Sequence, residues 1–223
     1  LELANVTASG LRLQAGGSVG AGGGTASDVN AAALNTAVAN LEALAGQNIY
    51  VEESDGLTVG GVGDVVVDRI SFDSGTDQAT DADLTGVNAV AGVAKLKAGG
   101  AVTVSEAFTA GTDALILTTA GDVTLDAALT ATAGDATVVA AAGVTQNAGG
   151  NITADDDVYV EAQAGSIEMT DGTTATATAG DLRYAASQNV LVSALTAANL
   201  ASVKATTGDI TDNTAAELAN VTA

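Results

Sequence analysis

A short pattern recurs along this chain: a turn-forming residue, an apolar residue, any residue, and a second apolar residue. Apolar residues two positions apart face the same side of a β-strand, and the residue between them faces the other side. Val123 and Leu125 are therefore predicted to point inward and Thr124 outward. The preceding Gly, Asn or Asp suits a sharp turn. Clear copies stand at 101–104, 122–125, 157–160, 181–184 and 189–192.

The spacing of these copies predicts how the strands are arranged. Their first apolar residues fall at positions 102 and 123, at 136 and 158, and near the end at 190, 200, 210 and 221. Neighbouring strands are thus often ~10 residues apart, and a full return takes ~20–22 residues, as in a solenoid. No Asn-Gly dipeptide marks a tight hairpin. We expect an all-β parallel β-helix over residues 1–223, with roughly ten coils and a length of about 50 Å.

The composition fits a narrow core and argues against several functions. Pro, Cys, His and Trp are absent, and aromatic residues make up 2% of the chain. A net charge of −21 opposes binding to nucleic acid or to anionic membranes. Without His or Cys, the chain lacks the commonest general base and the best nucleophile, so we expect no enzyme. No signal peptide or membrane-spanning run is evident, and we interpret the chain as an internal piece of a longer protein.

Two segments interrupt the strand pattern. Residues Ser27–Gly46 show apolar residues at three- and four-residue spacing, with Ser27 or Asp28 as the N-cap and Gly46 as the C-terminal stop. This predicts a short amphipathic helix inserted at 27–46, lying on the flank of the solenoid. Residues Asp73–Asp83 are polar and acidic, and they predict an exposed loop at 73–83.

No metal or cofactor site is predicted. Asp155–Asp157 is the densest acidic cluster, and two of its carboxylates would suit Ca²⁺, although a solvated turn before a strand explains the cluster better. Gly60–Asp68 approximates the calcium-binding nonapeptide repeat, but Asp64 comes one position too early and the motif does not recur. Calcium is therefore only a weak alternative to a chain without cofactors.

Residues Ala98–Leu129 ("AGGAVTVSEAFTAGTDALILTTAGDVTLDAAL") and Ala205–Asp212 ("ATTGDITD") resemble filamentous haemagglutinin-type repeats of very large secreted bacterial surface proteins. Ala45–Gly63 resembles a block found in giant bacterial repeat proteins. The resemblance implies a right-handed parallel β-helix, an extracellular or cell-surface location, and an adhesive or scaffolding role. It transfers no functional residue to this chain.

The heptapeptide "ELANVTA" occurs twice, 215 residues apart. We interpret the chain as about one period of a tandem superrepeat whose two ends occupy equivalent positions, so that each unit continues into an identical neighbour. We favour a covalent array over head-to-tail stacking of subunits. The predicted repeat junction consists of Glu2, Leu3, Ala4, Asn5, Val6, Thr7, Ala8, Glu217, Leu218, Ala219, Asn220, Val221, Thr222 and Ala223.

Two functions remain open from the sequence alone. The first is a structural unit that extends a filament, stalk or sheath outside a bacterial cell, with lateral packing through the predicted helix as a further hypothesis. The second is an adhesin module that binds glycan or protein on another surface. A binding module should expose aromatic or Arg side chains, and only Tyr159 stands at an outward position of a clear strand. The structural role is therefore favoured.

Overall fold

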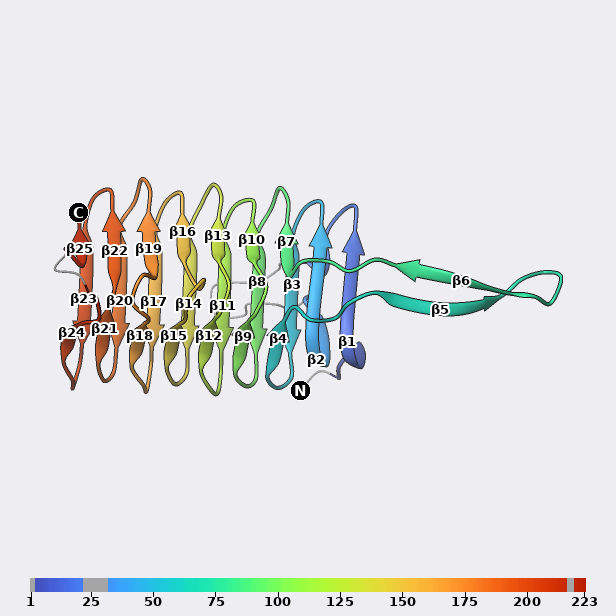
Figure 1. Cartoon of the computed structure of the whole chain (residues 1–223), viewed down its shortest axis with the longest axis horizontal. Coiled ribbons are helices and arrows are strands. Elements are labelled where there is room, and N and C mark those ends of the chain that lie inside the picture. The colour runs from blue at the N-terminus through green and yellow to red at the C-terminus, as the bar shows by residue number, and fades with distance from the viewer. Residues whose placement is uncertain (1–2, 22–31, 216–218) are drawn as a thin grey trace.

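The computed structural model describes residues 3–21, 32–215 and 219–223, and these form a parallel β-solenoid (Figure 1). Each full coil contributes one strand to each of three parallel ladders, which we call faces A, B and C. The corner between two faces carries both letters, such as the B–C corner. The parallel stack at 4.7–4.9 Å spacing satisfies the backbone hydrogen bonds of every inner strand.

Three ladders of short strands make up the faces. Face A contains β3 (Ile49–Glu53), β8 (Ala94–Ala98), β11 (Ala114–Thr118), β14 (Ala136–Ala140), β17 (Val158–Ala162), β20 (Leu182–Ala186) and β23 (Ala201–Ala205). Face B contains β4 (Leu57–Val59), β9 (Val102–Val104), β12 (Val123–Leu125), β15 (Val144–Gln146), β18 (Ile167–Met169), β21 (Val190–Val192) and β24 (Ile210–Asp212). Face C contains β7 (Val87–Ala89), β10 (Phe108–Ala110), β13 (Leu129–Ala131), β16 (Ile152–Ala154), β19 (Thr174–Ala177), β22 (Ala194–Ala197) and β25 (Val221–Thr222).

Two longer strands, β1 (Val6–Ala15) and β2 (Leu34–Ala45), form the first two rungs and run around all three faces. The register on face C follows nine rungs, and therefore eight turns: Leu13, Ala43, Val87, Phe108, Leu129, Ile152, Ala175, Leu195 and Val221. Eight turns are fewer than the roughly ten that the spacing predicts, because two insertions interrupt the coils. One lies between Ala21 and Ala32, and the other spans residues 60–86.

The alternation predicted from the sequence is confirmed. Val123 and Leu125 are buried and Thr124 is half-buried, and the same pattern holds in the short strands of the inner coils. Register partners on face B are 20 to 23 residues apart, at Val102, Val123, Val144, Ile167, Val190 and Ile210. The small apolar side chains thus stack into one continuous core.

The predicted helix at 27–46 is wrong in the part that the structure describes. Leu34–Ala45 is strand β2, which pairs with β1 on one side and with β3, β4 and β7 on the other; residues 27–31 lie outside the described residues. The spacing of Val38 and Leu41 also fits a strand that bends around the core, where both side chains are buried. Ladder bonds along both edges of β2 outweigh a weak helical preference. In the described part of the chain, no helix has the length and apolarity needed to cross a bilayer.

Tyr184 and Gln146 form a hydrogen-bonded polar pair within the core. Tyr184 is fully buried, and its hydroxyl donates a 2.7 Å hydrogen bond to Oε1 of Gln146, which is buried as well. Gln146 Nε2 in turn donates to the carbonyl oxygen of Gly150 at 2.8 Å. Burial raises the pKa of Tyr184 far above its usual value, so the hydroxyl remains a proton donor.

Candidate interface: the solenoid ends and the projecting arm

The C-terminal end of the solenoid leaves apolar core positions uncovered. Ile210 continues the inward row of Val190 and Ile167, yet its side chain is 53% exposed. Val221 continues the row of Leu195 and is 43% exposed. In the described structure, the outer edges of β23, β24 and β25 also pair with no further strand. Exposed strand edges beside apolar side chains favour pairing with another chain segment.

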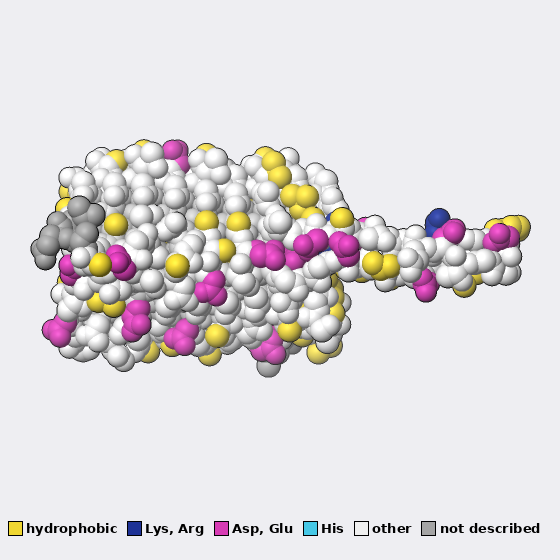
Figure 2. All heavy atoms as spheres, in the orientation of Figure 1, with side chains coloured by type: hydrophobic (Ala, Val, Ile, Leu, Met, Phe, Trp, Pro, Cys, Tyr) yellow, Lys and Arg dark blue, Asp and Glu magenta, His cyan; other side chains and the backbone are white. Residues whose placement is uncertain are grey.

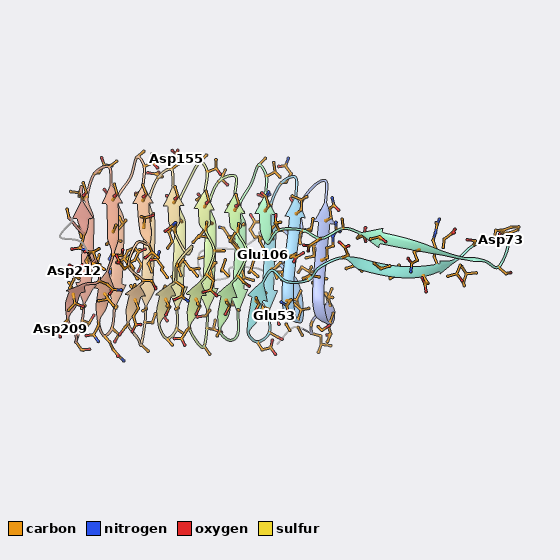
Figure 3. All side chains as sticks on the ribbon, in the orientation of Figure 1. Glu53, Asp73, Glu106, Asp155, Asp209 and Asp212 are labelled. Atoms are coloured by element: carbon orange, nitrogen blue, oxygen red, sulfur yellow. The ribbon has the colours of Figure 1, made fainter. Side chains whose placement is uncertain are left out.

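A polar cluster fixes the shape of this end. Asp212 Oδ1 accepts hydrogen bonds from the Thr214 amide (2.6 Å), the Thr214 hydroxyl (2.8 Å) and Asn220 Nδ2 (2.8 Å). These bonds, the Thr214 amide first, lower the pKa of Asp212 below its usual value. Asn220 Nδ2 also donates to the Ser193 carbonyl oxygen at 2.9 Å, which ties the last rung to the preceding coil. Asp212 and Asp209 both lie at this end in Figure 3.

The two copies of the predicted repeat junction lie at different positions around the coil. Val6 pairs with Thr36, just before the chain turns toward face B, whereas Val221 pairs with Leu195 on face C. This differs from the equivalent positions that the sequence suggests, because face C of the first rung is already occupied by Leu13, seven residues after Val6. Glu2, Glu217 and Leu218 lie outside the described residues.

The N-terminal copy is held by hydrogen bonds to the second rung. The Asn5 amide donates to the Asn35 carbonyl oxygen at 2.7 Å, and the Asn35 amide donates to Asn5 Oδ1 at 3.0 Å. Leu3 and Ala4 precede β1, and Leu3 is exposed. The residues from Val6 to Ala8 belong to β1, while Ala219 precedes β25 and Ala223 follows it. Both copies thus lie at the ends of the solenoid, on its first and last rungs.

A β-hairpin, which we call the arm, leaves the B–C corner of the third rung. It comprises β5 (Val65–Ile70) and β6 (Thr76–Asp81), which pair in antiparallel register. Figure 1 shows the arm running parallel to the solenoid axis, past β2 and β1 and beyond the N-terminal end. All twelve residues of the two strands are exposed. The segment 73–83 is therefore exposed as expected, but most of it is a strand instead of a loop.

Buried side chains of the solenoid fix the root of the arm. Glu42 on β2 is fully buried, and its two carboxylate oxygens accept bonds from the amides of Val62 (2.8 Å) and Leu84 (3.1 Å), one on each strand entering the arm. Asn40 Nδ2 donates to the Gly60 carbonyl oxygen at 2.8 Å. On the first rung, Arg12 Nε donates to the Ala82 carbonyl oxygen at 2.6 Å. The direction of the arm is thus set by two rungs of the solenoid.

The glycine-rich segment at 60–63 redirects the chain into the arm. Gly60 and Gly61 have φ angles of 105° and 72°, in the left-handed region that disfavours other residues. A Cβ on Gly60 would lie 2.6 Å from Cγ of Glu106, so a larger residue would also collide. The segment that approximates a calcium repeat therefore serves as a backbone corner, and Figure 2 shows acidic side chains gathered where the arm leaves the body.

The exposed aromatic residue is on the arm and not on a solenoid strand. Phe72 at the arm tip is 109% exposed, and Ile70 beside it is 77% exposed. Tyr159, the outward residue predicted from the sequence, is half-buried; its ring packs against the Arg183 guanidinium at 5.1 Å, and its hydroxyl donates to Glu161 at 2.9 Å. Sequence reasoning missed Phe72 because it lies in a segment without strand alternation.

A line of carboxylates follows the C–A corner. Asp113 Oδ1 accepts the Asp135 amide (3.2 Å), Asp135 accepts the Asp157 amide (3.0 Å), Asp157 accepts the Asp181 amide (2.7 Å), and Asp181 accepts the Leu200 amide (3.0 Å). Each aspartate thus positions the same turn in the next coil. These side chains act as turn braces, which accounts for an acidic residue at this position in four successive coils.

The neighbouring Asp155–Asp157 cluster is a part of this corner. Asp156 has its pKa raised above the usual value, first by repulsion from Asp157 and further by partial desolvation and by Asp135, Asp155 and Asp181. Within the described residues, no three His, Cys, Asp or Glu side chains are arranged to hold a metal ion. Asp155 lies at the edge of the solenoid in Figure 3, pointing to solvent.

We compared the chain with protein-family models, with curated proteins and with solved structures, and none of them matched. Function must therefore be inferred from the geometry of this chain. That geometry offers two features for binding: an open C-terminal rung, and at the opposite end an anchored arm with exposed apolar side chains.

Proposed function

We propose that this chain is a structural unit that extends a filament, stalk or sheath by end-to-end continuation of a right-handed β-solenoid. The open last rung carries the proposal. Ile210 and Val221 stand at core positions but have no rung above them in the described structure. A further rung of matching register would bury both side chains and pair the free backbone edges.

The first rung offers a complementary surface. One edge of β1 pairs with β2, and its other edge is free in the described residues. Leu11 and Leu13 on β1 are only partly buried against the core. Parallel stacking of this rung on β23–β25 of an identical unit would continue all three faces. The repeated heptapeptide supports an identical neighbour, whether the units are joined covalently or stack as separate subunits.

The resemblance to filamentous haemagglutinin-type repeats supports the same proposal, since those repeats build extended proteins on bacterial surfaces. An extracellular location and a role in a surface structure follow from it as part of the proposal. A net charge of −21 would keep such rods soluble and spaced from one another. The predicted lateral packing through a helix loses its basis, because Leu34–Ala45 is a buried strand.

Adhesion remains a second candidate, and one observation favours it. Phe72, Ile70 and Arg69 lie together at the end of a projecting arm, and exposed aromatic and Arg side chains are typical of binding hot spots. The end-to-end role is preferred because the arm runs along the axis, where a neighbouring unit would stand, instead of pointing away from the rod.

Solution scattering across a concentration series tests the proposal. The chain should form species whose length grows in steps of one unit while the cross-section stays constant. Ile210→Glu should weaken this association by at least about tenfold, or ~1.4 kcal/mol, since it places a charge on the buried contact. Thr211→Glu is the matched control, because Thr211 lies on the same strand with its side chain on the opposite side. Single rods of constant length at all concentrations would overturn the proposal.

A further inference from the structure

The arm is a two-stranded hairpin whose strands pair only with each other in the described structure. Both strands are exposed along their whole length, and the contacts with the solenoid lie at the root, at Val62, Leu84 and Ala82. An isolated two-stranded hairpin is marginally stable in water and usually needs a third strand or a packing surface. The arm therefore lacks the surface that would hold it.

The apolar side chains of the arm lie on both of its faces. Val65 and Val67 share one face with Ala79, and Val66 and Ile70 share the other. Phe72 extends the apolar surface to the tip. Such a run of exposed apolar side chains marks an interaction surface.

The root contacts show what lies beside the arm. Val62 packs over Gly10 of the first rung, where a Cβ would meet Val62 Cγ1 at 3.4 Å, and Arg12 of the same rung holds Ala82. The strands therefore begin where the solenoid ends, and Figure 1 shows them continuing along the axis. Any unit that stacks on the free edge of the first rung must therefore lie alongside the arm.

From the geometry we infer that the arm is a clasp that lies along the B–C corner of the preceding copy of this chain. This inference rests on the proposed end-to-end function and adds the contact surface to it. From Gly60 to Phe72, the arm covers about 40 Å at ~3.3 Å per residue, and nine rungs cover about 43 Å at ~4.8 Å each. The first part of this length passes the second and first rungs of its own unit, about 10 Å at ~4.8 Å each, so the arm reaches about 30 Å, or roughly six rungs, along the neighbouring unit.

The B–C corner of the later coils suits such a contact. Its turns are built largely of small residues, and they present few long side chains to an approaching hairpin: 126–128, 147–151, 170–173 and 213–215. Its acidic residues, Asp126 and Asp171, would face an arm that is itself acidic. Apolar contact must therefore overcome charge repulsion, and added salt should strengthen the clasp by screening it.

Cross-linking between copies tests the clasp. Because the chain has no native Cys, only the introduced Cys residues can react. One preparation carries Asp73→Cys at the arm tip, and a second carries Asp126→Cys on the B–C corner. A short bis-maleimide added to the mixture should give a covalent heterodimer. Asp156→Cys, on the C–A corner, is the matched control and should give none. Equal yields with Asp126→Cys and Asp156→Cys would overturn the inference.

Removing the arm separates this inference from the proposed function. A variant in which residues 64–83 are replaced by a short glycine linker should keep the solenoid but associate at least about tenfold more weakly. Circular dichroism with thermal unfolding would confirm that the solenoid persists. If this variant assembles into rods as well as the full chain does, the clasp is wrong and the end-to-end role stands. If the full chain never assembles, the proposed function fails first.

Discussion

The solenoid body and the arm are built from similar residues, but the apolar side chains of the body are buried and those of the arm are exposed. The body contains Phe108, which is 1% exposed among stacked rungs, and the arm contains Phe72, which is 109% exposed. Both regions consist of strands with satisfied cross-strand pairs. The difference shows that strand pairing alone buries little apolar surface in this chain; burial comes from closing each coil around a core.

The largest difference in the effect of a substitution on stability is expected between these two Phe residues, the only ones in the chain. Phe108→Ala should lower the free energy of unfolding by about 3–5 kcal/mol, because it leaves a cavity in a close-packed core. Phe72→Ala should change it by less than about 0.5 kcal/mol. Denaturant unfolding of both variants measures the difference. Similar losses in the two variants would show that the arm packs on the body.

The junction between body and arm should be sensitive to Glu42. Glu42→Gln places an amide N–H group against a backbone N–H, so one of the two root bonds is lost. The opening free energy at the Val62 and Leu84 amides should fall by about 1.5–3 kcal/mol, as for bonds to charged groups. Hydrogen exchange at these two amides checks the effect. Glu106→Gln is the comparison: Glu106 Oε1 accepts the Gly61 amide at 3.1 Å and Oε2 has no hydrogen-bond partner, so the amide nitrogen of Gln can take the place of Oε2 while the bond to Gly61 is kept. Unchanged exchange in Glu42→Gln would contradict the anchored root.

Within the body, loss of the Tyr184–Gln146 hydrogen bond should lower the free energy of unfolding by less than the cavity left by Phe108→Ala. Tyr184→Phe leaves Gln146 Oε1 without its donor and should cost about 1–3 kcal/mol. Adding Gln146→Leu removes the orphaned acceptor, so the double variant should cost less than the sum of the two single variants. Thermal unfolding of the three variants completes the cycle, and simple additivity would argue against a coupled buried pair.

The smallest effect on stability is expected from a substitution of Asp156 at the C–A corner. Because the pKa of Asp156 is raised in the folded chain, the folded state holds that proton more tightly than the unfolded state does. Protonation of Asp156 therefore stabilises the fold. This stabilisation grows as the pH falls through the pKa of Asp156 in the folded chain, and it is complete below the pKa of Asp156 in the unfolded chain. Asp156→Asn should melt slightly higher than the natural chain at pH 7 and lose this advantage at acidic pH. Scanning calorimetry across pH tests it, and a lower melting temperature at pH 7 would contradict the repulsion.

Much of the body could be predicted from the sequence because each coil repeats the same physical requirement. Pairs such as Val123 and Leu125 alternate with polar residues, and the coil length repeats within a few residues. The helix error at 27–46 arose because Val38 and Leu41 satisfy both a helical stripe and a bent strand. Only pairing with strands distant in sequence decides between the two, and the sequence of a single strand does not identify its pairing partners.

The arm and its root could not be predicted from the sequence. Glu42 and Leu84 are 42 residues apart, and nothing in the local pattern marks a carboxylate that will be buried under a hairpin. The glycines at 60–63 did signal a special backbone, but not its direction. The end positions of the two heptapeptides likewise depend on how many residues each coil absorbs.

Electron cryo-microscopy of assembled material would decide whether these units extend end to end. We expect continuous rods with an axial repeat of about nine rungs, or ~43 Å, and with the arm of each unit lying along the unit before it. Discrete rods one chain long, with closed ends and arms free in solvent, would contradict end-to-end extension.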